Sequence, residues 1–195
     1  MKQDRARRTH ALVLDAAAIE FAAHGAAGCS LDRVAARIGL TKGALYGHFA
    51  SKAALKAELL SQFESAWREL LDRADASAES ALDAMDTLLT GLTQRLGHDP
   101  RFGCGMRLIT DEAQVEGRLP PQYPELRNLI TRLAARAQQQ GELAPEPSAE
   151  TVGDSMLAIL VGVRHTTASN QPDQLVTRVA KLRDILLSDR SAAPG

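Results

Sequence analysis

Residues 41–49, TKGALYGHF, combine hydrogen-bond donors with a complete absence of acid. Four side chains in this segment can donate a hydrogen bond to an anionic oxygen: Thr41, Lys42, Tyr46 and His48. No carboxylate in the segment would repel such a partner, and the small residues after Lys42 leave room for close approach. We therefore expect the segment to face a polyanion, and nucleic acid is the first candidate.

The charges of the chain are divided unevenly along its length. The 195 residues carry a net charge of −1, but residues 1–60 hold nine Lys or Arg against five Asp or Glu. The remainder holds 14 bases and 19 acids. This asymmetry is expected when one part of a protein faces nucleic acid and the rest does not. A chance fluctuation over a short segment is the alternative interpretation.

Helices are expected to position the acid-free segment. The pattern predicts one helix over residues 7–24, a second that begins after the N-cap residue Ser30 and ends at Gly39, and a third from Thr41. Two helices joined by a tight turn around Gly39 are the helix-turn-helix arrangement, whose second helix enters the major groove of DNA.

The residues around the third helix divide into inward and outward groups. Leu45 and Phe49 are four residues apart, so both would point into the core of a small domain. Lys52 would lie at the N-terminus of the next helix, where the helix dipole also favours an anion. Each polar residue alone fits a solvated surface position, but the set between two glycine-punctuated helices favours DNA contact.

The stretch LDRVAARIGLTKGALYGHFASKAAL resembles the DNA-binding region of TetR-family transcriptional regulators. The resemblance rests on the Gly-apolar-Thr-Lys-Gly turn, on Leu-Tyr-x-His-Phe and on Ser-Lys. It implies an all-α fold, with an N-terminal three-helix DNA-binding domain and a C-terminal helical domain for ligand binding and dimerisation. It further implies operator contacts from Thr41, Lys42, Gly43, Ala44, Tyr46, His48 and Lys52, from Ser30 and Arg33 of the preceding helix, and from a basic N-terminal arm with Arg5, Arg7 and Arg8.

One exchange separates the first helix from the family pattern. The position of Ile19 is usually polar in the family, and that of Glu20 is usually apolar. A slight rotation of this helix, or contact of Ile19 with the C-terminal domain, would account for the exchange.

The rest of the chain also shows helical periodicity. Helices are expected over residues 51–75, 79–96, 101–114, 124–140, 148–169 and 172–188, with breaks at prolines and glycines. The predicted domains are a DNA-binding domain at 1–52, with the helix-turn-helix motif at 30–49 in a family-type region of about 7–67, a C-terminal domain at 53–190, and a tail at 191–195.

The last two expected helices indicate a homodimer. Residues 152–163 are apolar on nearly every face, and the following helix carries a continuous apolar stripe. A two-fold four-helix interface would suit a dimer that binds a palindromic operator as a repressor. One extended monomer core is the alternative. The predicted interface residues are Val152, Met156, Ile159, Val163, Leu175, Val179, Leu182 and Leu186.

The C-terminal half has a narrower resemblance to the γ-butyrolactone autoregulator receptors, a branch of the TetR family. The shared features are the run at residues 105–108, the proline-rich loop before Pro124 and the segment at residues 161–164. Those receptors usually place a Trp after the proline-rich loop to cover the lactone, and Leu126 stands at the corresponding position here. Related pseudo-receptors that respond to antibiotics or their intermediates, and TetR-type regulators of drug efflux or other metabolism, are the alternatives.

A ligand site in such a domain needs apolar walls and a few polar groups that orient the ligand. The expected walls are Trp67, Met85, Leu89, Met106, Ile109, Tyr123, Leu126, Ile130, Met156 and Leu160. The expected orienting groups are Asp86, Arg107, Thr110 and Gln122. Each of these residues fits an ordinary core or surface position as well as a ligand contact.

The sequence argues against an enzyme. The five histidines show no paired metal-ligand spacing, and no GxSxG, P-loop or GxGxxG motif is present, so no catalytic residue, cofactor or metal is expected. Cys29 and Cys104 are expected to be buried thiols. A helical adaptor that does not bind DNA would leave the acid-free segment unexplained. Without a long uninterrupted apolar run, a cytoplasmic protein with no membrane partner is expected.

Overall fold

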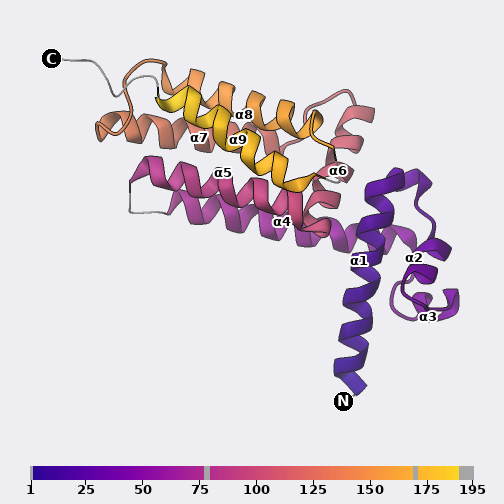
Figure 1. Ribbon diagram of the computed structural model, residues 1–195. Coiled ribbons are helices and arrows are strands. Elements are labelled where there is room, and N and C mark those ends of the chain that lie inside the picture. Colours follow the sequence, from indigo (N-terminus) through magenta and orange to yellow (C-terminus); the bar gives the residue numbers. More distant parts are fainter. Residues whose placement is uncertain (1, 77–79, 169–170, 189–195) are drawn as a thin grey trace. The chain divides into compact units, whose positions relative to one another are not determined.

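The computed structural model describes residues 2–76, 80–168 and 171–188, and these residues form helices without a β-strand among them (Figure 1). The all-α fold predicted from the sequence is therefore confirmed. The chain divides into two compact units, which are described separately. Unit 1 comprises Met1–Ala66 and Asp99–Arg118, and unit 2 comprises Trp67–His98 and the chain from Leu119 onward.

Unit 1 is built from α1 (Lys2–Gly28), α2 (Leu31–Arg37), α3 (Lys42–Tyr46), the first part of α4 (Lys52–Asp75) and α6 (Pro100–Val115). Figure 1 shows α2 and α3 beside α1. The predicted helix stop at Gly25 is confirmed, because this residue has a φ of +67° inside the span of α1. Glycine adopts this left-handed conformation without the steric penalty of a Cβ atom.

The core of unit 1 follows the helical period of α1. Val13, Ala17 and Phe21 are four residues apart along one face, and all three are fully buried. The segment Asp4–Gly28 also has the length and the mean hydropathy of 1.2 at which a helix could cross a membrane. Its buried face packs in the core of unit 1, as in a core helix of a folded domain.

Helix α6 packs against α1 and α4 within unit 1. The rings of Phe63 on α4 and Phe102 on α6 lie 4.9 Å apart, and a Cβ atom at Gly105 would come within 2.4 Å of the Phe63 side chain. Arg101 of α6 donates to Asp15 at 2.7 Å and to the carbonyl of Ala11 at 2.9 Å. Apolar packing and the hydrogen bonds of Arg101 therefore both hold α6 within unit 1.

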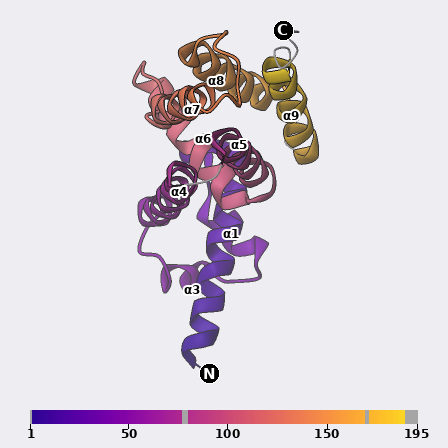
Figure 2. The same ribbon diagram turned by 90° about the vertical axis from the view of Figure 1, so that its left-hand side faces the viewer.

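Unit 2 is built from the remainder of α4, α5 (Ala81–His98), α7 (Gln122–Gln139), α8 (Ala149–His165) and α9 (Pro172–Ser188). Figures 1 and 2 show α8 beside α7 and α9 beside α8. Helices α7 and α8 approach closely at Gly153, where a Cβ atom would lie 2.2 Å from the Thr131 hydroxyl oxygen. A side chain larger than hydrogen at this point would push the two helices apart.

The predicted helices are all present, with ends displaced by at most five residues. The largest difference is at α1, which was expected to begin at residue 7 and begins at Lys2. Helix α8 was expected to reach residue 169 and ends at His165. The hydroxyls of Thr166 and Thr167 donate to the carbonyls of Gly162 and Val163, each at 2.7 Å, and so close the helix.

The unit boundaries differ from the domain boundaries drawn from the sequence. The DNA-binding domain was expected to end at residue 52, whereas unit 1 extends to Ala66 and includes α6. Contacts between residues distant in sequence define the unit, and local periodicity does not contain them. The tail expected at 191–195 lies outside the described residues.

Five of the eight residues predicted at the dimer interface are buried in the core of unit 2. Packing of α8 and α9 against other helices of the same chain buries Val152, Met156, Val163, Leu175 and Val179. An apolar stripe cannot distinguish a core inside the chain from an interface between chains, so an interface role of these five residues stays a prediction. Of the other three, Leu182 is exposed, while Ile159 and Leu186 are half-buried.

Candidate functional site

The turn between α2 and α3 is tight and fixed by backbone contacts. Gly39 has a φ of +66°, and the Leu40 amide donates to the Ala35 carbonyl at 2.9 Å. Thr41 caps α3, since its hydroxyl accepts from the Ala44 amide at 3.2 Å. The predicted roles of Gly39 as the turn residue and Thr41 as the N-cap are confirmed.

Two buried side chains anchor the region of α3. Leu45 is fully buried, and Phe49 is 4% exposed, so both point into unit 1 as their spacing predicted. The ring of His10 on α1 stacks on Phe49 with 4.5 Å between ring centroids. These contacts fix which face of the short helix is turned outward.

The outward face of α3 carries the residues that the sequence assigned to DNA. Thr41, Lys42, Gly43, Ala44 and Tyr46 are exposed, and Tyr46 keeps 45% of its surface in solvent. His48 follows the helix and is half-buried, and the centroid of its ring lies 6.4 Å from that of His10. Donors thus flank an exposed helix surface that has small side chains at Gly43 and Ala44. A surface of this kind can lie against base edges and phosphates.

An acidic residue of α2 lies beside the exposed face of α3, although residues 41–49 themselves contain no acid. Asp32 of α2 lies 3.0 Å from the ammonium of Lys42, and the two side chains are 64% and 57% exposed. The hydrogen bond to Asp32 raises the pKa of Lys42, so the ammonium stays charged. Reading residues 41–49 alone missed this pair, because its two members are ten residues apart. An acid and a base on either side of the predicted turn, at Asp32 and Lys42, were the signal from which this ion pair could have been predicted.

Three residues predicted as DNA contacts hold the turn between α1 and α2. Ser30 caps α2 and accepts from the Arg33 amide at 3.5 Å. The Arg33 guanidinium donates to the Glu20 carboxylate and, at 2.6 Å, to the Gly28 carbonyl. The Lys52 ammonium donates to the carbonyls of Ala27 and Cys29 at 3.2 and 3.3 Å.

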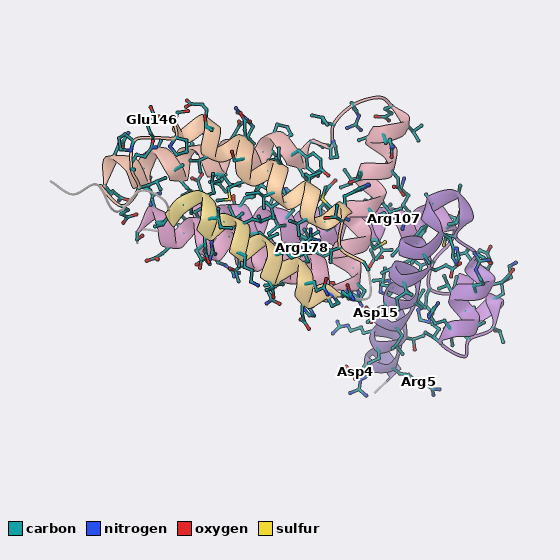
Figure 3. All side chains as sticks on the ribbon, turned by 45° about the horizontal axis from the view of Figure 1, so that its top comes forward. Asp4, Arg5, Asp15, Arg107, Glu146 and Arg178 are labelled. Atoms are coloured by element: carbon teal, nitrogen blue, oxygen red, sulfur yellow. The ribbon has the colours of Figure 1, made fainter. Side chains whose placement is uncertain are left out.

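The three basic residues of the expected N-terminal arm belong to α1. Arg5, Arg7 and Arg8 are exposed within the helix, and Arg5 extends from its N-terminal end (Figure 3). The segment is therefore helical rather than a separate extended arm. Its charges lie on the same unit as α3.

The candidate ligand residues fall into both units. In unit 2, eight apolar candidates form part of the core or its edge: Trp67, Met85, Leu89, Leu126, Ile130, Met156 and Leu160 are buried, and Tyr123 is half-buried. Four other candidates lie in unit 1: Met106, Arg107, Ile109 and Thr110. The sequence grouped these twelve residues by their expected helices, whereas compact packing separates them.

Most of the polar ligand candidates already have partners. Arg107 of α6, labelled in Figure 3, donates to the Ala22 carbonyl and pairs with Asp111 at 3.5 Å. Thr110 donates to the Met106 carbonyl at 2.7 Å. Asp86 forms an ion pair with Arg183 of α9. These contacts stabilise the helices and leave little capacity for a ligand.

Gln122 differs from the other polar candidates. Its side chain is 7% exposed, and its Oε1 atom has no hydrogen-bond partner among the described residues. One turn further along α7, the Glu125 carboxylate accepts from the Trp67 indole at 2.9 Å. A buried acceptor without a donor is rare in native proteins and requires a water or another bound group as partner.

Metal-ligating side chains are scattered over the described part of the chain. No group of three or more His, Cys, Asp or Glu side chains gathers at one point among those residues. Both thiols are buried, and burial raises the pKa of Cys104 to about 12 and that of Cys29 above its ordinary value. They are packing residues in the core of unit 1.

Two family descriptions match the chain in succession. Residues 13–59 match "Bacterial regulatory proteins, tetR family", and residues 79–190 match "Tetracyclin repressor-like, C-terminal domain". The first range contains α2, α3 and the start of α4, and the second contains most of unit 2 together with α6.

Individual relatives agree with these matches. The HTH-type transcriptional repressor BepR of Brucella suis is 25% identical over 165 residues, which cover 80% of this chain and 79% of that protein. The A-factor receptor protein of Streptomyces griseus is 26% identical over 166 residues, which cover 84% of this chain but 56% of that longer protein.

Solved structures of CprB from Streptomyces coelicolor, a TetR family protein, are also similar. One is 28% identical with a TM-score of 0.75 and covers 96% of this chain and 93% of that chain. Another, in complex with its biological operator sequence, is 26% identical with a TM-score of 0.68 and covers 92% and 98%. The chain belongs to the tetR family of bacterial regulatory proteins and is a ligand-responsive, DNA-binding transcriptional regulator.

Proposed function

We propose that this regulator is a homodimeric repressor that binds a palindromic operator through α3 and releases it when a small molecule binds in unit 2. The proposal of DNA binding rests on one observation, namely that α3 has one buried apolar face and one exposed polar face. Leu45 and Phe49 fix the helix from inside, while Thr41, Lys42 and Tyr46 are presented to solvent. The same protein would act in the cytoplasm, where its operator lies.

The outward residues have different roles in this proposal. Thr41, Lys42, Gly43 and Ala44 approach the base edges, because they lie at the start of the helix that enters the major groove. Tyr46 and His48 donate to phosphate oxygens. Positive charge on α1 comes from Arg5, Arg7 and Arg8. The turn between α1 and α2 is stabilised by hydrogen bonds of Ser30, Arg33 and Lys52. That CprB, to which this chain is similar, was solved in complex with its operator supports DNA binding as such.

Fluorescence anisotropy tests the DNA-binding proposal. The labelled duplex is the DNA upstream of the protein's own gene, and a scrambled duplex of equal length is the control. We expect tight binding whose logarithm falls linearly with the logarithm of salt concentration. Binding that is absent at low ionic strength, or that does not respond to salt, would contradict the regulator.

The exposed apolar residues of α9 support a homodimer. Leu182 is 38% exposed and Ile185 is 68% exposed, and neither is covered by a helix of the same unit. Two helix-turn-helix units one DNA turn apart bind a palindrome far more tightly than a single unit. Sedimentation velocity of Ile185→Glu, with Lys181→Glu as the matched surface control, tests the interface. A dimer that survives Ile185→Glu unchanged would place the interface elsewhere.

The effector proposal rests on the apolar core of unit 2 and on the buried Gln122 oxygen. A ligand that carries a hydroxyl or N–H could satisfy this oxygen, which otherwise costs about 1–3 kcal/mol of stability. Two relatives are an A-factor receptor and a γ-butyrolactone receptor, so a lactone-like signal is the first candidate. Antibiotic intermediates form a second group of candidates.

Release would follow from a shift between two conformations of the dimer. The ligand must prefer the conformation whose two α3 helices no longer match successive major grooves. Pulsed EPR on Ala50→Cys dimers, labelled at this exposed position beside α3, measures the separation of the two helices. Equal separations with and without a ligand that releases the operator would contradict this mechanism.

A regulator of drug efflux or other metabolism with an unrelated inducer is the second candidate. The observation in its favour is Leu126, which is buried in unit 2 at the position where lactone receptors usually carry Trp. A thermal-shift screen separates the candidates when lactones, furans, antibiotic intermediates and lipophilic drugs are compared in parallel. Stabilisation by one class alone would define the effector, because a ligand of the native state raises its melting temperature.

A further inference from the structure

A buried carboxylate lies behind the DNA-reading helices. Glu20 of α1 is 1% exposed, although an ionised group in this position loses its hydration. It accepts hydrogen bonds from Nε of Arg33 and from the Ser30 amide, the latter at 3.4 Å, and His24 lies 3.8 Å away. Burial raises the pKa of Glu20, but the hydrogen bonds from Arg33 and Ser30 outweigh it and hold the pKa below its ordinary value.

The same guanidinium also reaches the backbone. Arg33 donates through its second nitrogen to the Gly28 carbonyl at 2.6 Å, so its fork joins Glu20 on α1 to the turn before α2. A Lys side chain offers a single point charge and cannot reproduce this two-point contact. Lys52 at the start of α4 donates to the Ala27 and Cys29 carbonyls of the same turn.

The exchange of Ile19 and Glu20 has a physical explanation in this contact. Val13, Ala17 and Phe21 form the inward face of the first helix and are all fully buried. Glu20 also takes an inward position and Arg33 neutralises it, while Ile19 is 40% exposed. An inward carboxylate is tolerated only when its charge is paired.

We propose that Glu20 is a positioning residue for operator recognition, which acts through Arg33 to set the orientation of α2 and hence of α3. The link from α2 to α3 is short, since Gly39 and Leu40 are held to α2 by the Ala36 and Ala35 carbonyls. A displacement of α2 would therefore move Thr41 and Lys42. Arg33 itself supports the turn and does not bind phosphate.

The variant Arg33→Lys distinguishes a positioning role of Arg33 from a phosphate contact. It keeps the positive charge but removes the two-point contact with Glu20 and the Gly28 carbonyl. We expect its operator affinity to fall by about tenfold, as for the loss of one charged hydrogen bond, while the salt dependence and the affinity for scrambled DNA stay unchanged. Arg33→Ala should behave in the same way. If Arg33 were a phosphate contact, Arg33→Lys would bind normally, and Arg33→Ala would lower the salt slope by about one.

A double-mutant cycle tests the coupling to Glu20. Glu20→Gln and Arg33→Ala, alone and combined, are measured on the full chain with the operator duplex, and circular dichroism gives the folded fraction of each. We expect the double variant to bind no more weakly than the weaker single variant. Additive losses would overturn the proposal, and so would normal operator binding by folded Glu20→Gln. If Glu20→Gln does not fold, the comparison of Arg33→Lys with Arg33→Ala still tests whether Arg33 positions α2 or binds phosphate.

Glu58→Gln is the matched control for the loss of a carboxylate in unit 1. Glu58 lies 3.4 Å from His10 at a half-exposed position, so its amide variant should bind the operator normally. The inference rests on the proposal that α3 reads the operator. Failure of that proposal would appear as loss of the difference between operator and scrambled DNA in the unmodified protein. Failure of the Glu20 inference would leave that difference intact in the variants.

Discussion

The ammonium of Lys42 lies 3.0 Å from a carboxylate oxygen of Asp32, which links the first residue of α3 to α2 across the turn. Both side chains are exposed, so solvent screens the pair and its contribution to stability is small. Under the proposed function the pair matters for DNA binding, because Lys42 would have to exchange Asp32 for a phosphate or a base edge before it contributes to affinity.

Asp32→Asn should strengthen non-specific DNA binding several-fold, because it releases Lys42 and removes a repelling charge from the exposed face. Anisotropy with a scrambled duplex measures the effect. In an Lys42→Ala background the gain should be much smaller. Asp83→Asn, an exposed acid of unit 2, is the control for net charge. Equal gains from both acid-to-amide changes would mean that the pair has no specific role.

Leu45→Ala should destabilise the protein by about 2–5 kcal/mol, since the side chain is fully buried and its loss leaves a cavity. Urea unfolding followed by circular dichroism measures the change. Tyr46→Ala removes a larger side chain that is 45% exposed, and it should cost much less stability but more operator affinity. The reverse ranking would show that α3 is oriented differently.

Gly153→Ala should destabilise unit 2 by about 1–3 kcal/mol, because the new methyl group would lie 2.2 Å from Thr131 Oγ1 and 3.1 Å from the Arg127 carbonyl. Gly162→Ala on the same helix is the control. A Cβ atom there meets nothing within 4 Å among the described residues, so the higher helix propensity of Ala should leave stability unchanged or slightly raised. Thermal unfolding of both variants compares them directly.

Gln122→Leu should raise stability by about 1 kcal/mol, because it removes a buried acceptor that lacks a donor. The same change should abolish the thermal shift caused by an effector that binds this oxygen. Gln138→Leu on the same helix is the control. The Gln138 amide donates to the Ala144 and Pro147 carbonyls at 2.9 Å, so its loss should lower stability. A destabilised Gln122→Leu would indicate that the oxygen is satisfied by bound water.

Acidification should destabilise unit 1 through Glu20. Because the folded-state pKa of this carboxyl is held below its ordinary value of 4.5, its stabilising contribution is present above that value. The contribution is lost as the pH falls through the folded-state pKa. Melting temperatures measured from pH 7 down to pH 3 should therefore drop less steeply in Glu20→Gln than in the unmodified protein. Parallel curves would contradict the assignment of this pKa.

The fold could be predicted to a large extent from local signals. Apolar residues recur with the helical period in α1, and Ser30, Gly39 and Thr41 mark the ends of the neighbouring helices. Such signals lie within a few residues of one another, so they are visible in the sequence. The outward face of α3 followed from the spacing of Leu45 and Phe49 for the same reason.

The partners of polar side chains could not be predicted in this way. Glu20 and Arg33 are 13 residues apart, and Arg101 and Asp15 are 86 apart, so only packing brings them together. Ser30, Arg33 and Lys52 have the residue types of DNA contacts, and their hydrogen bonds to the turn before α2 were not visible in the sequence. The buried stripe of α8 and α9 likewise fits a core and an interface equally well.

The sequence by itself determined the helices, the helix-turn-helix and the residues of α3 that are exposed, because periodicity, caps and glycine turns are local. Only the tertiary structure decided which partner each polar side chain has, on that face and in the turn before α2. The physical reason is that a hydrogen bond or ion pair depends on the distance between atoms, and folding sets this distance independently of separation along the chain.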